Sequence, residues 1–387
     1  MRIAIDAQLS ANGRHGGVEQ FLIGLIRALG KLDDGAEEYT IIGHWRDSAW
    51  LMPYLGANQR LVIGRRPPGD QAKAWLGPMR NVVGRFLREA QHNLRDSYPI
   101  TIPESDGWYE SLGVDVLHFP YQFFVRCNLP TIFNPHDLQH RHLQILDPAE
   151  SAQREALYAV ACQEARAVVA DSVWGREDIA KQYGAMPEKL YAIPMSASTE
   201  MCPPVTDRLL ETVRVKYHLP PTFAFYPAQT WAHKNHLSLL EALALLRDRD
   251  GLVIPLVCSG HQNEYWRTIL QYIRKLKLEN QVRFLGFVES NELRALYHLA
   301  QFVIHPSLFE GGGLPILEAF REGVPVACAN DTSLPEYGGD AVFLFDPTSV
   351  ESIADAIRRM ALDTDLRATM REHGTARIRC FDWERTA

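Results

Sequence analysis

The chain has 387 residues, of which 46% are hydrophobic and 22% are charged. A chain of this length and composition folds into two or three domains without disulfide support, which excludes a disordered tail and a collagen-like repeat. Asp and Glu number 47 against 40 Lys and Arg, and the net charge of −7 argues against a general nucleic-acid-binding protein.

Short apolar runs alternate with segments of helical periodicity in the first half of the chain. Residues 2–6 predict a strand, and apolar side chains recur at helical spacing over residues 18–29. Further strands are predicted at residues 39–42, 61–63, 114–119, 131–133, 167–170 and 191–193.

The same alternation restarts at residue 222. Strands are predicted at residues 222–226, 252–258, 282–285, 302–305 and 324–327, and helices at residues 237–246, 264–275, 292–300 and 315–322. Strands that are apolar on both faces and alternate with helices predict an α/β fold with parallel sheets covered on both sides. Proline pairs at residues 203–204 and 220–221 mark the joint between two halves. Two such sheets in series place a ligand cleft between domains, at the carboxyl ends of the strands.

The ends and the cysteines give no sign of export. The first apolar run is interrupted by Asp6 and is too short for a signal peptide, and no stretch reaches about 18 apolar residues. The six cysteines are scattered singly, without a CxxC pair, which favours reduced thiols in a cytoplasmic protein over a zinc ribbon or a redox dithiol.

Residues 60–95 depart from the average composition. They contain eight basic and two acidic residues, a local charge of +6, together with an apolar stripe at helical spacing. One interpretation is a basic amphipathic surface that contacts anionic lipid. The other is a helix that packs its stripe on the sheet and leaves its arginines in solvent.

A glycine-rich turn follows the strand predicted at residues 302–305. The glycines at 311–313 free the backbone to turn and let a ligand approach closely, and Pro315 suits the start of a helix. The N–H groups at such a helix start favour anions. Glu310 and Glu318 flank the turn, and carboxylates accept hydrogen bonds from sugar hydroxyls. The pattern indicates phosphate-binding amides between two carboxylates, with a plain strand–turn–helix as the alternative.

The order of motifs around this turn resembles a known family. Glu310 and Glu318 are separated by seven residues within FEGGGLPILEA, and the motifs GVPV, SLPE, GDA and DP follow over residues 323–347. This resembles the E-x7-E signature of glycosyltransferase family 4, whose members are retaining enzymes. The resemblance implies a GT-B fold, in which two Rossmann-like domains with parallel sheets face each other across a cleft.

The resemblance also implies roles for individual residues. Glu310 would hold hydroxyls of the transferred sugar, and Glu318 the ribose of the nucleotide. Lys234, in WAHKNH, resembles the family lysine that grips the donor diphosphate as a point charge. Two positions depart from the family pattern: the usual arginine five residues before the lysine is Gln229, and the usual phenylalanine after the first glycine is Gly312.

The first half of the chain adds weaker matches. Gly16 and Gly17 resemble the family's glycine loop, which approaches the diphosphate, and they lack the GxGxxG spacing of a nicotinamide-dependent dehydrogenase. His136 resembles the histidine that faces the transferred sugar, with His118 as the alternative. The pair at residues 171–172 resembles a strand-end serine at the cleft, or caps a helix.

Two sets of site residues follow from the resemblance. The catalytic set is His136, Glu310 and Lys234. The donor-binding set is Gly16, Gly17, Gln229, Lys234, Gly311, Gly312, Gly313, Leu314 and Glu318. We expect neither a cofactor nor a metal, because Lys234, Gln229 and helix amides would stabilise the leaving group. The DxD at residues 248–250 trails a helix and is interpreted as a solvated turn, and His233 and His236 are interpreted as non-ligands.

These expectations define a hexosyltransferase that moves a sugar, with mannose favoured, from a nucleoside diphosphate sugar to a hydroxyl of a glycan or lipid-linked acceptor. GDP-mannose is favoured over UDP-sugars as the donor, and the product would be a bacterial surface polysaccharide, such as lipopolysaccharide.

The expected parts of the chain are an acceptor domain at residues 1–205, a donor domain at 206–375 and the start of a crossover helix at 376–387. We expect a cytoplasmic enzyme with a peripheral contact to the inner face of the plasma membrane through residues 60–95, and no nucleic-acid partner. A non-catalytic nucleotide-sugar-binding subunit and a sugar-nucleotide epimerase on the same fold remain the alternatives.

Overall fold

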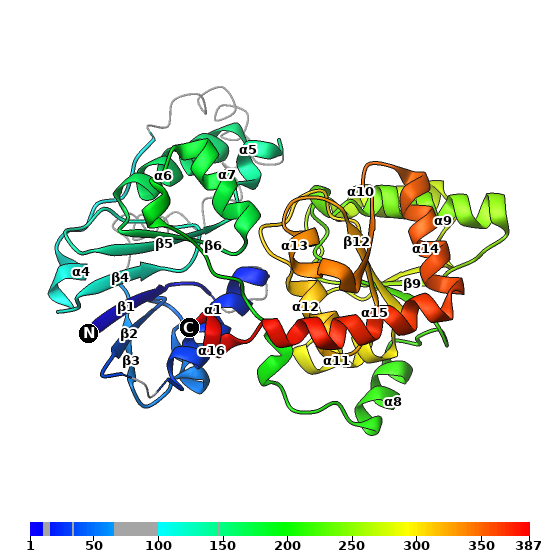
Figure 1. Ribbon diagram of the computed structural model, residues 1–387, viewed down its shortest axis with the longest axis horizontal. Coiled ribbons are helices and arrows are strands. Elements are labelled where there is room, and N and C mark those ends of the chain that lie inside the picture. The colour runs from blue at the N-terminus through cyan, green and yellow to red at the C-terminus, as the bar shows by residue number, and fades with distance from the viewer. Residues whose placement is uncertain (11–15, 33–34, 66–99, 145–146) are drawn as a thin grey trace, which may run out of the picture. The chain divides into compact units, whose positions relative to one another are not determined.

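The computed structural model describes residues 1–10, 16–32, 35–65, 100–144 and 147–387. The chain divides into two compact units (Figure 1). The first unit consists of Met1–Ala11, Gly30–Val169 and Ile179–Leu190, and the second of Asn12–Leu29, Ala170–Asp178 and Tyr191–Ala387. Two segments of the N-terminal half, Asn12–Leu29 and Ala170–Asp178, therefore belong to the same unit as the C-terminal half. The boundaries expected at residues 205 and 375 stay predictions.

The first sheet has seven strands in the order β3-β2-β1-β4-β5-β6-β7. The strands are β1 (Arg2–Ala7), β2 (Glu38–Gly43), β3 (Gln59–Ile63), β4 (Val116–Phe119), β5 (Thr131–His136), β6 (Ala167–Ala170) and β7 (Leu190–Ala192). The pairs β1–β2, β1–β4, β2–β3 and β4–β5 are parallel. The helices of this part of the chain are α1 (Gly17–Leu29), α4 (Trp108–Ser111), α5 (Gln139–His142), α6 (Pro148–Glu164) and α7 (Val173–Tyr183), with short 3-10 turns η1 (Ala49–Tyr54), η3 (Pro187–Lys189) and η4 (Ser198–Met201).

The second sheet has six parallel strands in the order β10-β9-β8-β11-β12-β13. Its strands are β8 (Ala224–Pro227), β9 (Leu256–Ser259), β10 (Val282–Phe284), β11 (Phe302–His305), β12 (Val326–Ala329) and β13 (Val342–Phe345). Its helices are α8 (Asp207–Lys216), α9 (His236–Asp250), α10 (Trp266–Lys275), α11 (Ser290–Leu299), α12 (Leu314–Arg321), α13 (Leu334–Gly338), α14 (Val350–Leu362), α15 (Thr364–Arg377) and α16 (Trp383–Thr386), with the 3-10 turns η5 (Ala232–Lys234), η6 (Gly339–Ala341) and η7 (Ile378–Cys380).

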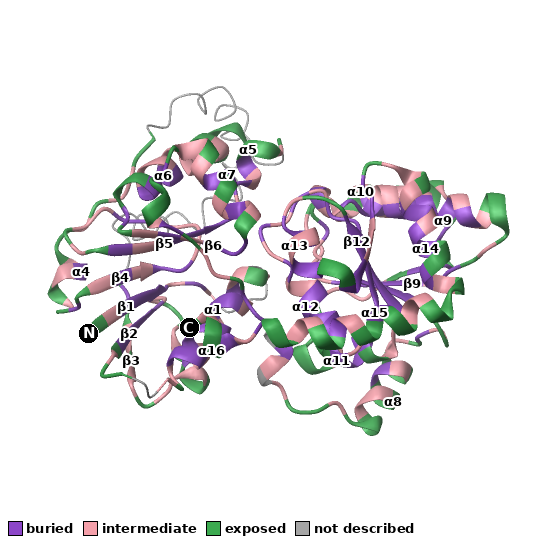
Figure 2. Ribbon diagram, in the orientation of Figure 1, coloured by how far each residue is buried: buried purple, intermediate pink, exposed green. Residues whose placement is uncertain are grey.

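Apolar side chains cover both faces of the second sheet. Because successive residues of a strand point to opposite faces, Phe225 of β8 packs into one core cluster and Tyr226 into the other. Helices α8, α11, α12 and α13 contribute to the first cluster, and α9, α10 and α14 to the second. Every residue of β9, β11 and β12 is buried, as the purple ribbons of Figure 2 show. This confirms the α/β fold with two parallel, Rossmann-like sheets.

A tryptophan near the C-terminus fixes helix α1 within the second unit. Trp383 is buried, its ring centroid lies 5.9 Å from that of Phe21, and its indole N–H donates to the carbonyl of Ala197. A Cβ atom added at Gly24 would lie 2.2 Å from the indole ring, so the helix and the ring touch where α1 has no side chain. The C-terminal segment thus holds an element from the start of the chain.

The amphipathic prediction for residues 60–95 falls largely on residues 66–99, which lie outside the described part of the chain. It stays a prediction. Within the described part, Arg65 pairs with Asp106 at 2.7 Å on the surface. No helix of the described residues has the length and apolar character needed to cross a membrane.

Candidate functional site

The second unit brings two predicted residues together at the carboxyl ends of neighbouring strands. Lys234 closes the 3-10 turn that follows β8, and Glu310 lies in the turn that follows β11. Because β8 and β11 are parallel neighbours, these turns meet at one edge of the sheet. The ammonium Nζ of Lys234 lies 2.6 Å from Oε1 of Glu310.

The ion pair is largely buried, with 18% of the lysine side chain and 12% of the glutamate side chain exposed. Burial by itself would raise the pKa of Glu310, but the charge of Lys234, a hydrogen bond from His305 and the nearby His233 outweigh burial and lower it. The backbone of Glu310 is fixed as well, because its N–H donates to the Thr332 hydroxyl and its carbonyl accepts from the Ser333 hydroxyl. The site therefore holds an ionised carboxylate in a fixed position.

The glycine turn beside Glu310 packs closely against Tyr337. A Cβ atom at Gly313 would lie 2.5 Å from Cγ of Tyr337, so this position excludes a side chain. At Gly312 the added atom would meet the Tyr337 hydroxyl and Cε of Met195, each at 3.3 Å. The aromatic residue usual in the family after the first glycine would have to displace these side chains, which explains why a glycine suits position 312.

Glu318 is buried in α12, on the other side of the glycine turn from Glu310. The hydroxyl of Tyr297 donates to its Oε2 at 2.8 Å and also approaches the carbonyl of Pro315 at 3.3 Å. Tyr297 thereby ties the carboxylate to the first turn of its own helix. The helix begins at Leu314, so its first N–H groups lie between the two carboxylates of the signature.

Gly16 and Gln229 come together although 213 positions separate them in the sequence. Gly16 has a left-handed φ of +54°, and a Cβ atom there would lie 2.9 Å from the amide nitrogen of Gln229. The left-handed conformation therefore favours glycine, whereas the contact alone could be relieved by a shift of the Gln229 amide. The amide oxygen of Gln229 accepts from the indole N–H of Trp231. Gly17 has open space where a Cβ would stand.

Of the two roles considered for residues 171–172, the structure shows the helix cap, and the place at the cleft stays a prediction. The hydroxyl of Ser172 accepts from the N–H of Gly175 and so caps α7. The same hydroxyl donates to the carbonyl of Gly311 at 3.1 Å. The Tyr337 hydroxyl donates to the carbonyl of Asp171. This serine therefore supports the glycine turn as well as the helix.

The histidine candidates of the first half lie at the ends of strands in the first unit. His136 ends β5 with a left-handed φ of +62°, and its Nε2 lies 2.9 Å from the carbonyl oxygen of Pro120, to which it donates. His118 lies 2.7 Å from Oδ1 of Asn134, and burial lowers its pKa to about 4. His118 is thus an uncharged histidine with a structural hydrogen bond. The role of His136 towards the transferred sugar stays a prediction.

Three side chains of the site were missed by sequence reasoning. His305 contacts Glu310, Tyr226 contacts Lys234 through its hydroxyl, and Tyr297 contacts Glu318. The available signal was a polar atom in an otherwise apolar segment: His305 ends a fully buried strand, and buried polar groups take hydrogen-bond partners.

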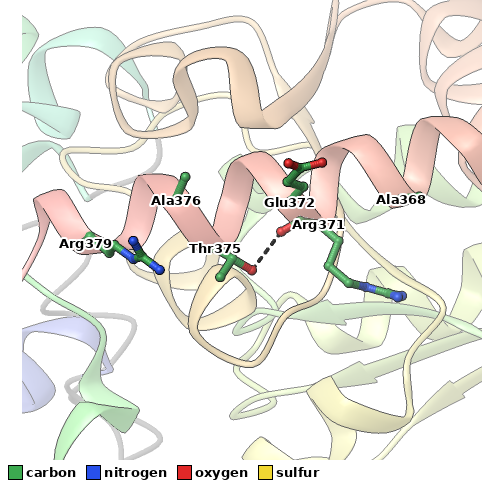
Figure 3. Close-up of a pocket in the computed structure, with 6 residues that line it drawn as sticks. All are labelled: Ala368, Arg371, Glu372, Thr375, Ala376 and Arg379. Atoms are coloured by element: carbon green, nitrogen blue, oxygen red, sulfur yellow. Dashed lines mark hydrogen bonds between the residues drawn. The ribbon is translucent and has the colours of Figure 1, made fainter.

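Two other features lie apart from this site. Asp248 and Asp250 pair with Arg247 and Arg249, and residues 248–250 are exposed as expected. The prediction of a turn after the helix is wrong, because α9 extends to Asp250 and the DxD forms its last turn. Among the described residues, no cluster of three or more His, Cys, Asp or Glu side chains could hold a metal ion. A shallow hollow along α15 and η7 is shown in Figure 3, and it involves none of the predicted site residues. Its lining is Ala368, Arg371, Glu372, Thr375, Ala376 and Arg379.

Comparison with solved structures shows the type of fold. The crystal structure of Anabaena Alr3699/HepE in complex with UDP and glucose matches over 99% of this chain and 96% of that chain, with a TM-score of 0.69 and 18% sequence identity. At this identity the likeness shows the fold, which is the GT-B arrangement of two Rossmann-like domains. The GT-B fold predicted from the sequence is thereby confirmed.

Residues 213–377 match the family model described as glycosyl transferases group 1. The chain is 28% identical over 302 residues to the O-antigen chain mannosyltransferase B of Escherichia coli, covering 77% of this chain and 79% of that protein. It is 29% identical over 241 residues to the serotype-specific mannosyltransferase WbdA of Escherichia coli, covering 62% of this chain but only 28% of WbdA. The protein is a glycosyltransferase, which confirms the enzyme class predicted from the sequence.

Proposed function

We propose that the protein transfers mannose, with retention of configuration, from GDP-mannose to a hydroxyl of a glycan or lipid-linked acceptor in the synthesis of a surface polysaccharide. The sugar and the setting are supported by the names of the mannosyltransferases to which the chain is similar. The observation that carries the proposal is the Lys234–Glu310 pair, at adjoining strand ends beside a glycine turn and a helix start.

The donor would be held by separate groups along the edge of the second sheet. The diphosphate takes the place of Glu310 as the partner of the Lys234 ammonium, since a lysine binds phosphate as a point charge. N–H groups of residues 311–314 and the Gln229 amide add hydrogen bonds. Glu318 accepts from the ribose hydroxyls and Glu310 from hydroxyls of the sugar, because an ionised carboxylate accepts strongly.

The chemical step would use this charge distribution without a metal. Lys234 and the helix amides stabilise the negative charge that develops on the leaving diphosphate. An oxocarbenium-like sugar forms while the acceptor hydroxyl attacks from the face that the diphosphate leaves, and the departing phosphate takes the acceptor proton. His136 would face the sugar and stabilise positive charge at the anomeric carbon.

Calorimetry with GDP, UDP, dTDP and ADP, without added metal, tests the donor site. We expect GDP to bind wild type, and Lys234→Ala to weaken binding at least tenfold because it removes the charge opposite the diphosphate. Lys275→Ala, which removes an exposed lysine of α10 in the same unit, is the matched control and should bind as wild type does. Binding of UDP in preference to GDP would overturn the donor assignment.

A transfer assay with GDP-mannose and a mannose-containing lipid-linked acceptor then tests the reaction. Proton NMR of the new linkage should show the α-anomer, as in the donor. A wild type that binds GDP but neither transfers nor hydrolyses GDP-mannose would favour the non-catalytic subunit. Inversion at the anomeric carbon would overturn the retaining mechanism.

A further inference from the structure

His305 is a buried polar residue with a defined partner in the candidate site. It ends β11, is fully buried, and places its Nε2 atom 3.1 Å from Oε1 of Glu310. A carboxylate of lowered pKa only accepts hydrogen bonds, so the ring hydrogen lies on Nε2. The other ring nitrogen, Nδ1, is buried and has no hydrogen-bond partner among the described residues. Within the described segments, the hydrogen bonding of the ring is therefore directed at Glu310 alone.

The histidine and the lysine share one oxygen of the carboxylate. Nζ of Lys234 lies 2.6 Å from the Oε1 atom that His305 also contacts. Among the described residues, Oε2 of Glu310 has no hydrogen-bond partner. Both protein contacts are thus made on one side of the carboxylate, and the second oxygen remains available to a hydroxyl group.

The two contacts differ in how easily they can be given up. Lys234 ends in a compact charge on a flexible stem, whereas His305 belongs to a buried strand. The His305 ring packs edge-on against Tyr226, with centroids 5.6 Å apart and planes at 77°. The Tyr226 hydroxyl donates to the backbone carbonyl of Lys234 at 2.6 Å, which fixes the base of the lysine while its ammonium can turn.

A donor diphosphate that attracts Lys234 would leave Glu310 as a buried carboxylate. Without a partner, burial raises a carboxyl pKa and favours the protonated form, which no longer accepts on both oxygens. A histidine that keeps its hydrogen bond on Oε1 prevents this and holds the carboxylate plane. The exchange of the lysine between Glu310 and phosphate therefore needs a second, immobile donor.

We propose that His305 is a positioning residue: it holds the Glu310 carboxylate by Oε1 while Lys234 moves to the donor diphosphate, and so presents Oε2 to the sugar hydroxyls. This inference rests on the proposed function of the site. According to this inference, binding of the diphosphate does not require His305, whereas transfer of the sugar does.

The test compares His305→Phe, which keeps a ring of similar size without a donor, with His305→Gln, whose amide nitrogen reaches a similar position. His236→Phe is the matched control, because His236 also packs against Tyr226, with centroids 4.9 Å apart, and has no hydrogen-bond partner among the described residues. For His305→Phe we expect kcat to fall about tenfold to a hundredfold, the range for loss of a hydrogen bond to a charged group. The KM for the sugar nucleotide should rise, while the Kd of GDP stays within about twofold.

The pH profile separates positioning from general packing. Loss of the hydrogen bond raises the pKa of Glu310, so the acid limb of kcat/KM should move to higher pH in His305→Phe and return in His305→Gln. If His305→Phe does not fold, His305→Asn replaces it, since its shorter amide cannot reach Glu310. A phenylalanine or asparagine variant with wild-type kcat, KM and pH profile would overturn this inference alone. The inference would also be overturned if kcat, KM and the pH profile of His305→Gln were no closer to wild type than those of the phenylalanine or asparagine variant. A wild type that neither binds GDP nor transfers sugar would overturn the proposed function together with it.

Discussion

Two buried ion pairs of the second unit are built in different ways. Arg294 of α11 contacts Glu322 at 2.5 Å and also donates to the carbonyl of Pro203, and His298 contacts the other carboxylate oxygen at 2.6 Å. Only 10% of the arginine side chain and 2% of the glutamate side chain are exposed. In the Lys234–Glu310 pair one carboxylate oxygen receives both protein contacts, and the cation is a single-point lysine.

This difference indicates that the Arg294–Glu322 pair stabilises the fold and that the Lys234–Glu310 pair is available to a ligand. The planar fork of Arg294 and the ring of His298 contact both oxygens of Glu322, so each carboxylate oxygen has a protein partner, and the pair joins α11 to the segment after α12. Within the described part of the chain, the lysine pair keeps donors of Lys234 and the Oε2 acceptor of Glu310 without a partner. A saturated pair contributes to stability, whereas an unsaturated one can exchange partners.

The largest effect on stability is expected from breaking the saturated pair. Arg294→Met leaves Glu322 as a buried charge without its arginine, which should lower the free energy of unfolding by about 3–5 kcal/mol. Urea unfolding measures this loss, and the activity of the folded fraction should stay near that of wild type. The double variant Arg294→Met/Glu322→Leu should recover much of the stability. Equal loss in both variants would show that the arginine acts through packing alone.

Breaking the Lys234–Glu310 pair should reduce activity more than stability, the reverse of the expectation for Arg294→Met. Lys234→Met should lower kcat/KM on the order of a hundredfold to a thousandfold, because it removes the charge that stabilises the leaving diphosphate. Its effect on urea unfolding should be smaller than that of Arg294→Met, since 12% of the Glu310 side chain is exposed against 2% of the Glu322 side chain, and the carboxylate left behind is less deeply buried. Steady-state transfer assays and urea titrations on the two variants give the comparison. A Lys234→Met protein that is as unstable as Arg294→Met and retains its activity would reverse the assignment of the two pairs.

Packing around the glycine turn allows a finer comparison of neighbouring residues. Gly313→Ala places a methyl group 2.5 Å from the Tyr337 ring, and the overpacking should cost about 1–3 kcal/mol of stability and weaken binding of GDP. Gly312→Ala meets its nearest atoms at 3.3 Å and should cost less than about 1 kcal/mol, because a methionine end can shift. Thermal unfolding with and without GDP distinguishes them, and equal effects would refute the packing argument.

Much of the second sheet could be predicted from local sequence. The strand expected at residues 302–305 is β11, because four consecutive apolar or buried residues follow a helix and precede a turn. Helices α6 and α15 were missed, since their outer faces are polar and their apolar residues form no clear stripe. Strand β13 was missed as well, at the end of the sheet.

The site could be predicted only residue by residue. Lys234 and Glu310 were both assigned to the donor, but their contact across 76 positions depends on β8 lying beside β11, which local sequence does not specify. His305 gave no periodic signal, because a polar residue at a strand end is compatible with solvent as well as with burial. The spacing of the motifs therefore predicted which residues bind the donor, and the order of strands in the sheet determined which of these residues are in contact.

His236, a buried residue close to Lys234, should show an effect on stability that depends on pH. Both ring nitrogens lack a hydrogen-bond partner among the described residues, and burial together with the charge of Lys234 lowers its pKa to about 3. His236→Phe should raise the free energy of unfolding by about 1 kcal/mol at pH 7, since it replaces an unsatisfied polar ring among aromatic neighbours.

The pH dependence of this variant gives the sign of the effect. A histidine with a folded pKa of about 3 and an unfolded pKa of about 6.5 binds its proton only in the unfolded state between these values, so wild type loses stability as pH falls below about 6.5. His236→Phe lacks this loss, and its advantage over wild type should grow by about 1–2 kcal/mol between pH 7 and pH 5. Urea titrations across this range measure it, with the half-exposed His373 replaced by Phe as the control. A constant difference between the variant and wild type would mean that His236 takes up its proton in the folded protein, and that the surroundings of Lys234 tolerate a second positive charge.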